Sequence, residues 1–243
     1  MHPVLFEAFG YAVPTYGLLV LLSALVIAGL FVAREAAAGG IGGGPAAELF
    51  LVAASVGLLG AKLPLLVAGG DGHGLLRSGG YFDAGMLAGT AAALLWLRAR
   101  GLPILATADR AALALLPGAA IGRLGCLAAG CCHGRPCALP WAIVYRDPRA
   151  QALAGVPLGL PLHPAPLYFA LAHLAILGVL MILIRTSVGA GRVLGAYLVL
   201  AGAARLALGR FRSDPGEGGA AFVIALLAVM AGLGLWWRTG RRA

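Results

Sequence analysis

The sequence predicts an all-α membrane protein with about seven transmembrane helices, folded as a single domain over residues 1–243. Of the 243 residues, 61% are hydrophobic and only 11% are charged, and the mean hydropathy is +0.94. These values lie far outside the range of soluble domains. The 38 glycines let membrane helices approach closely, where van der Waals packing must hold them together. We therefore expect a tightly packed helical bundle.

Each predicted helix is a run of about 20 apolar residues that ends at charges or at Pro/Gly clusters. The runs cover residues 13–33, 46–69, 84–97, 106–122, 163–184, 193–208 and 220–237. Between the fourth and fifth helices lies an irregular segment, rich in Gly, Pro, Cys and Arg, that we expect to face outward. Because connectors inside a domain are usually short, its length of about 40 residues predicts a functional role.

The arginines indicate an orientation. If every segment spans, one side holds Arg34, Arg98, Arg100, Arg185, Arg192, Arg238, Arg241 and Arg242. The positive-inside rule makes that side the cytoplasm. The other side still holds Arg77, Arg135, Arg146, Arg149, Arg210 and Arg212, which fits side chains that bind an anion such as a lipid phosphate. Although the net charge is +9, the basic residues are scattered, which argues against nucleic-acid binding.

Two arginines close to membrane segments are candidate functional residues. Arg123 follows the fourth predicted helix, and Arg205 lies near the end of the sixth. An ionisable residue at such a position costs about 3 kcal/mol on insertion scales, and is by default a functional candidate. A guanidinium offers a planar fork of donors suited to phosphate oxygens. The alternative is that each side chain only extends to the membrane interface.

Other candidates have equally simple structural explanations. Asp83 begins the third predicted helix and suits either a general base, if burial raises its pKa, or an N-cap. His163 and His133 are single histidines, which are more often structural than catalytic. Tyr16 and Gly17 lie where an interfacial aromatic belt is expected.

All four cysteines lie between residues 126 and 137, at Cys126, Cys131, Cys132 and Cys137. Zinc sites usually contain cysteine pairs separated by two to four residues, and no Cys-x-x-Cys pair is present. On a continuous helix, residues five apart diverge by about 140°, so Cys126 and Cys131 would not share a face. A metal site is therefore not predicted. A disulfide on the outward side, or small side chains filling a glycine-rich bend, remain open.

Short motifs along nearly the whole chain follow the order found in one protein family. They are HPVLF (2–6), YG (16–17), GRLG (122–125), HGRP (133–136), LPWAIVY (139–145), HPAPLY (163–168) and YLVLAGAARLALGRFRSDP (197–215). In order and spacing this set resembles the prolipoprotein diacylglyceryl transferases. Each motif alone is modest, but the ordered set, ending in Arg-x-x-x-x-x-Phe-Arg-x-x-Pro, is specific.

The resemblance implies a seven-helix enzyme of the bacterial inner (cytoplasmic) membrane, with its active site toward the outer leaflet. Such an enzyme transfers the diacylglyceryl group of phosphatidylglycerol to the lipobox cysteine thiol in the signal peptide of a preprolipoprotein. Glycerol phosphate is released and a thioether is formed. The implied partners are phosphatidylglycerol, the preprolipoprotein and membrane lipid, with no cofactor and no nucleic acid.

The resemblance also implies roles for single residues. Arg123 and Arg205 match the family's two essential arginines, Tyr16 matches its tyrosine in the first helix, and Gly134 matches its signature glycine. The two arginines suit a phosphodiester and the charge that grows on the leaving phosphate, while a base takes the thiol proton. The further predicted substrate-binding residues are Gly17, Cys126, Arg135 and His163.

Several positions depart from the family pattern. Asp83 replaces a histidine in Phe-His-Gly-Gly, Cys126 replaces the asparagine after Gly-Arg-x-Gly, and Cys131 replaces the glutamate of Asn-Gly-Glu. Phe169 and Gly209 stand where the family has glutamates. We therefore keep two alternatives: a diverged relative that uses another acceptor, and a non-catalytic lipid-binding or thiol-redox membrane protein.

Overall fold

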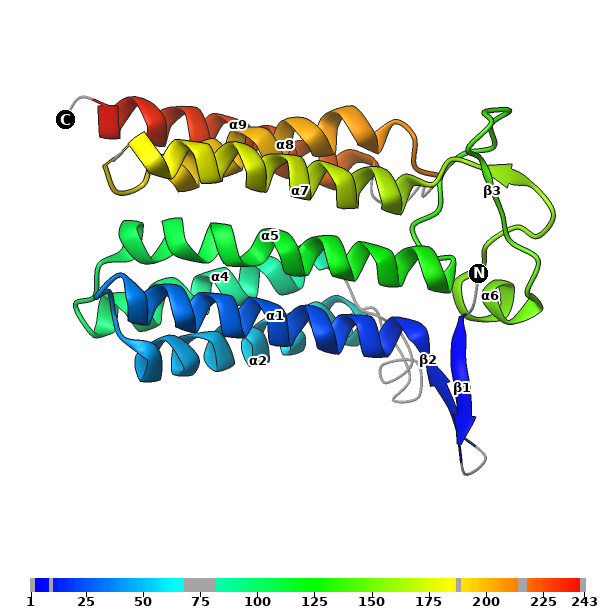
Figure 1. Cartoon of the computed structure of the whole chain (residues 1–243), viewed down its shortest axis with the longest axis horizontal. Coiled ribbons are helices and arrows are strands. Elements are labelled where there is room, and N and C mark those ends of the chain that lie inside the picture. Colours follow the sequence, from blue (N-terminus) through cyan, green and yellow to red (C-terminus); the bar gives the residue numbers. More distant parts are fainter. Residues whose placement is uncertain (1–2, 9–10, 68–81, 187–188, 214–217, 241–243) are drawn as a thin grey trace. The chain divides into compact units, whose positions relative to one another are not determined.

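The fold consists mainly of long helices (Figure 1). A computed structural model describes residues 3–8, 11–67, 82–186, 189–213 and 218–240. The helices of 18 or more residues in this part of the chain are α1 (Thr15–Ala37), α2 (Gly43–Val67), α4 (Phe82–Ala99), α5 (Ile104–Ala129), α7 (Ala165–Leu183), α8 (Arg192–Gly209) and α9 (Gly218–Gly240). They correspond one to one with the predicted segments, so the all-α prediction is confirmed. Among the residues used above, His2, Arg77, Asp214, Pro215, Arg241 and Arg242 and the end of the predicted helix 46–69 lie outside the described ranges.

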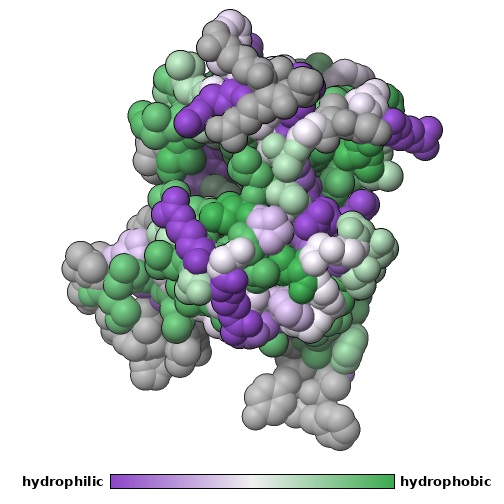
Figure 2. All heavy atoms as spheres, turned by 90° about the vertical axis from the view of Figure 1, so that its left-hand side faces the viewer, coloured by the Kyte–Doolittle hydropathy of each residue, from purple (hydrophilic) through white to green (hydrophobic). Residues whose placement is uncertain are grey.

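Six of these helices are long and apolar enough to cross a membrane, and the protein is a multi-pass membrane protein. The helix α4, with 18 residues, is not among the six. Basic residues stand in the last turn of α1 at Arg34, of α4 at Arg98 and of α9 at Arg238. Figure 2, viewed from the left-hand side of Figure 1, shows purple hydrophilic side chains among green hydrophobic ones. Charges at helix ends and apolar flanks are what a lipid environment selects.

Short elements flank the long helices. The strands β1 (Val4–Ala8) and β2 (Tyr11–Pro14) form an antiparallel hairpin ahead of α1. Between α5 and α7 lie β3 (Ile143–Val144), the helix α6 (Pro148–Ala154) and β4 (Pro161–Leu162), and β3 pairs antiparallel with β4. A 3-10 turn, η1 (Ile184–Thr186), follows α7. The segment predicted to be irregular therefore contains a small hydrogen-bonded structure.

The helix α5 is longer than predicted. The sequence suggested an end at Gly122, but the helix continues to Ala129 and thus contains Arg123 and Cys126. Gly125 does not break the helix, because it packs closely against α1. A Cβ at Gly125 would lie 3.2 Å from Leu19 Cβ. The helix ends before Gly130, whose φ of +85° is the left-handed conformation of a C-terminal glycine.

The described residues group into two compact units, 1–27 with 111–243 and 28–110. Both α1 and α5 contribute residues to each unit. The grouping therefore does not by itself divide the chain into domains, and the single domain of residues 1–243 stays a prediction.

In the unit of residues 28–110, α2 and α4 pack through small residues. A Cβ placed on Gly89 would lie 2.7 Å from the Ala53 carbonyl oxygen, and one on Gly85 would lie 2.7 Å from the Gly57 carbonyl oxygen. Backbones this close maximise van der Waals contact where lipid offers no hydrophobic driving force.

A buried carboxylate closes the turn after α1 in the same unit. Glu35 is fully buried, and its side chain accepts from Arg110 Nε at 2.8 Å and from the Ile41 backbone N–H at 2.9 Å. Both oxygens thus have donors, as a buried charge requires. The sequence marked Arg34–Glu35 only as a helix end and gave no sign that Glu35 is buried.

In the unit of residues 1–27 and 111–243, α8 and α9 meet through glycines in the same way: a Cβ on Gly202 would lie 2.8 Å from the Ala225 carbonyl oxygen. Next to them, a cluster of buried side chains joins α5, α7 and α8. Its members are Leu113, Leu116, Ile176, Leu180 and Val193. A second cluster, Tyr145, Ala150, Val156 and Leu162, lies within the segment between α5 and α7.

The glycine contact between α2 and α4 leads to a stability prediction. Gly89→Leu forces its side chain against the α2 backbone, so we expect a loss of about 1–3 kcal/mol and a lower melting temperature in detergent. Gly29→Leu is the matched control, because a Cβ at Gly29 on α1 meets no described atom within 4 Å. Equal melting temperatures for the two variants would contradict the packing explanation.

Candidate functional site

Three thiols converge just after the end of α5. Cys126 lies in the last turns of the helix, and Cys131 and Cys132 follow Gly130. The sulfur atoms of all three lie within 4.8 Å of one another. The expected divergence of Cys126 and Cys131 is wrong, because it assumed a continuous helix. Instead Gly130 (φ +85°) and Cys132 (φ +55°) adopt left-handed conformations that turn the chain back.

The thiols of Cys131 and Cys132 have pKa values shifted in opposite directions. Hydrogen bonds from Cys126 and Cys131 lower the pKa of Cys132 well below its usual value; the positive charges of Arg212 and Arg123 lower it further, and burial opposes them. Hydrogen bonds with Cys126 and Cys132 raise the pKa of Cys131.

Arg123 lies one turn before Cys126 on α5 and is half-buried. Its guanidinium stacks on the Phe169 ring of α7, with Cζ 4.9 Å from the ring centroid. Among the described residues it has no hydrogen-bond acceptor and no ion-pair partner. Its hydrogen-bond donors are thus available to an anion from outside the chain.

Tyr16 and Gly125 place α1 beside this end of α5. A Cβ on Gly125 would meet Tyr16 Cδ2 at 3.4 Å. Tyr16 also interacts electrostatically with the three thiols of the cluster and with Arg123. The structure therefore brings together Tyr16, Arg123 and Cys126, three residues predicted from the sequence.

The chain after the cluster runs as an extended segment between two others. Gly134 N–H donates to the His163 carbonyl at 3.0 Å, and Arg135 N–H donates to the Phe211 carbonyl at 2.9 Å. Gly134 also forms an antiparallel bridge with Arg212. A Cβ on Gly134 would lie 2.8 Å from the Phe211 carbonyl oxygen and 2.5 Å from that of His163. Only glycine fits there without displacing one neighbour.

Side chains reinforce this backbone pairing. Arg135 Nε donates to the Arg212 carbonyl at 3.0 Å, so this predicted substrate-binding side chain also has a structural contact. Ser213 Oγ lies 2.9 Å from His133 Nδ1 and donates to the His133 carbonyl at 3.0 Å. In the same region, burial raises the pKa of Tyr145, whose hydroxyl donates to the Leu127 carbonyl at 2.9 Å.

His163 belongs to an aromatic cluster. Its ring centroid lies 5.0 Å from that of Phe211, and its Nδ1 lies 3.2 Å from the Tyr168 hydroxyl. Trp141 Nε1 donates to the same hydroxyl at 2.8 Å. These contacts hold the imidazole in place, which suits a residue that shapes a site.

The remaining predicted residues lie elsewhere. Arg205 is half-buried near the C-terminal end of α8, and Gly17 lies in the first turn of α1, where a Cβ would be 3.4 Å from Pro14 Cγ. Asp83 belongs to the other unit. It lies in the first turn of α4, where a carboxylate complements the helix dipole.

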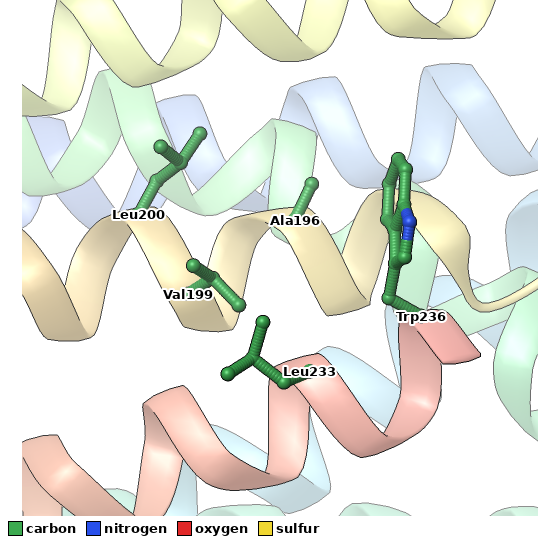
Figure 3. A pocket seen from close by; sticks show the side chains of 5 residues that line it. All are labelled: Ala196, Val199, Leu200, Leu233 and Trp236. Carbon is green, nitrogen blue, oxygen red and sulfur yellow. The ribbon is translucent and has the colours of Figure 1, made fainter. Parts of the chain in front are cut away.

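An apolar pocket between α8 and α9 has no comparable chemistry (Figure 3). It is lined by Ala196, Val199, Leu200, Leu233 and Trp236. None of these residues is ionisable, so the pocket offers contacts for a hydrocarbon chain but no group for catalysis.

Sequence reasoning missed two features of this region. The convergence of Cys131 and Cys132 on Cys126 depends on backbone conformations that spacing alone does not reveal. The contact of Phe169 with Arg123 was also missed, although the departure from the family pattern at position 169 marked that residue for attention.

Comparison with known proteins agrees with the motif pattern. The family model described as prolipoprotein diacylglyceryl transferase matches residues 3–238. A protein of Clostridium tetani named phosphatidylglycerol–prolipoprotein diacylglyceryl transferase is 26% identical over 222 residues, covering 88% of this chain and 87% of that protein. The protein of the same name from Clostridioides difficile is 26% identical over 244 residues, covering 96% and 93%.

A third protein of that name, from Ruegeria pomeroyi, is 30% identical over 187 residues, covering 69% of this chain and 63% of that protein. The match of the family model extends over nearly the whole chain, including the thiol cluster, Arg123 and the extended segment around Gly134. On this basis the chain belongs to the prolipoprotein diacylglyceryl transferase family.

Proposed function

We propose that the chain transfers the diacylglyceryl group of phosphatidylglycerol to a cysteine thiol of a prolipoprotein. The observation that carries this proposal is the half-buried Arg123 guanidinium, which has no acceptor among the described residues. It lies in a chain of this family. A guanidinium binds oxyanions such as a phosphodiester through two parallel N–H donors.

The proposed reaction breaks one bond and forms one. The acceptor thiol loses its proton to a base, and the thiolate attacks the glyceryl carbon that bears the phosphodiester oxygen. The carbon–sulfur bond forms, the carbon–oxygen bond breaks, and glycerol phosphate leaves with the electron pair. Arg123 and Arg205 stabilise the charge that grows on the leaving phosphate.

Other residues have supporting roles in this proposal. Tyr16 lies beside Gly125 on the Arg123 helix, where its hydroxyl can orient a lipid headgroup. Gly134, Arg135 and His163 shape the extended segment next to it, and Gly17 and Cys126 border the site. Asp83 is the proposed base. The site faces the outer leaflet of the bacterial inner membrane, and the acceptor is the lipobox cysteine of a signal peptide.

A direct assay tests the reaction. The full chain in phosphatidylglycerol vesicles should add the mass of one diacylglyceryl group to a lipobox peptide and release glycerol phosphate in equal amount. A peptide with serine in place of the lipobox cysteine is the control and should stay unmodified. Absence of the adduct with a folded, membrane-inserted protein would exclude this function and favour a relative with another acceptor.

Arg123 provides the sharpest single variant. Arg123→Ala removes the proposed phosphate donors, and we expect kcat/KM to fall by about 10²–10³-fold. Arg123→Lys keeps the charge but not the fork, so we expect it to recover only part of the rate. Arg185→Ala is the matched control, because Arg185 is exposed in η1 beyond α7. Activity that survives in Arg123→Ala would remove the phosphate-binding role.

The role of Asp83 is tested by Asp83→Asn, which keeps the shape of the side chain and removes the base. If Asp83 takes the thiol proton, kcat falls while KM changes little. If it is only a carboxylate complementing the α4 dipole, kcat is kept and only the melting temperature decreases. The measured kcat therefore separates the two roles.

A further inference from the structure

We propose that Cys126, Cys131 and Cys132 form a binding site for a thiophilic d10 cation, zinc or copper(I), with the three sulfur atoms as ligands. This inference does not depend on the proposed transferase function. It starts from the convergence of the sulfur atoms within 4.8 Å of one another. A tetrahedral ion with metal–sulfur bonds of about 2.3 Å needs sulfur atoms about 3.8 Å apart. Small side-chain rotations are enough to close that difference.

The backbone arranges the ligands before any ion binds. Cys126 is held by α5, and the left-handed conformations at Gly130 (φ +85°) and Cys132 (φ +55°) direct the following chain back toward it. A positive φ at a non-glycine residue is uncommon and costs free energy. Cys132 is the one non-glycine residue with a positive φ among the described residues. In the proposed site, binding of the ion by its sulfur offsets that cost.

Deprotonation of Cys131 leaves the Cys126 carbonyl with a hydrogen-bond donor. Cys131 Sγ donates weakly to the Cys126 carbonyl at 3.7 Å, a bond that is lost when the thiol binds an ion. The same carbonyl also accepts from Gly130 N–H at 3.0 Å, so it keeps its stronger donor. The thiol protons pass to solvent as the metal–sulfur bonds form, and no electron is transferred.

The charges around the cluster favour a thiolate-bound ion. Three thiolates with a divalent cation carry a net charge of −1, and with copper(I) they carry −2. Arg123 and Arg212 both interact electrostatically with Cys132 and supply positive charge beside the site. Thiolate ligands select zinc and copper(I) over hard cations such as magnesium or calcium.

The described side chains provide three ligands and no fourth. His133 Nδ1 already contacts Ser213 Oγ at 2.9 Å and the Gly134 carbonyl at 3.2 Å. Cys137 is not part of the group. Three ligands suit copper(I) in trigonal geometry, or zinc with an open fourth position of the kind found in catalytic sites.

Metal titration of the purified full chain, reduced and then freed of reductant, tests the site. Cadmium serves as the probe for the zinc arm through its sulfur-to-metal charge-transfer absorption, and copper(I) is titrated against a chromophoric chelator. We expect one ion per chain, and a loss of affinity of more than about 100-fold in Cys132→Ser, since even residues supporting a ligand cost 10–100-fold. Cys137→Ser is the matched control and should bind normally.

Several outcomes would overturn the site. They are no charge-transfer band and no copper binding in the wild-type chain, equal effects of Cys137→Ser and Cys132→Ser, or a disulfide within the cluster found by alkylating the chain before reduction. Cys126→Ser is a second variant on the rigid helix, in case Cys132→Ser fails to fold. Since no lipid or peptide is present, the result is independent of transferase activity.

Discussion

Backbone hydrogen bonding of the extended segment around Gly134 holds the proposed site together. This segment has no helix to satisfy its N–H and C=O groups, and near a membrane each unsatisfied group is costly. It is paired instead with the chain before α7, through His163, and with the chain after α8, through Phe211. The end of α5, the start of α7 and the end of α8 are thereby fixed to one another. Gly134 permits the pairing, because a side chain there would meet both neighbouring carbonyls.

This pairing brings an arginine and an aromatic ring together in a way that the family pattern alone does not explain. Phe169 stands where the family has a glutamate, and the Arg123 guanidinium stacks on its ring. A carboxylate near the guanidinium would compete with phosphate for the same donors. The ring contributes a cation–π interaction of about 0.5–2 kcal/mol and leaves the N–H groups available. The substitution that removes a polar group thus preserves the capacity of Arg123 to bind an anion.

Hydropathy predicted the fold well, because each membrane helix needs a long apolar run. The α5 boundary was missed because Gly122 and Gly125 resembled helix breakers, whereas Gly125 is a packing surface for Leu19 and Tyr16. The burial of Glu35 was also missed, since it depends on Arg110, a partner far along the chain. Among the predicted site residues, the structure brings Tyr16, Arg123 and Cys126 together. Contacts that depend on a reversal of the chain, such as those of Cys131 and Cys132, cannot be predicted from residue spacing.

The thiol cluster and Arg123 cannot be considered independently. Cys132 interacts electrostatically with Arg123 and Arg212, so thiolates without a cation attract the same guanidinium that is proposed to hold phosphate. In a site of low effective dielectric, that attraction lowers the affinity for a second anion. Protonated thiols carry no charge and leave Arg123 available to phosphate. The charge of the cluster therefore influences the anion affinity of Arg123.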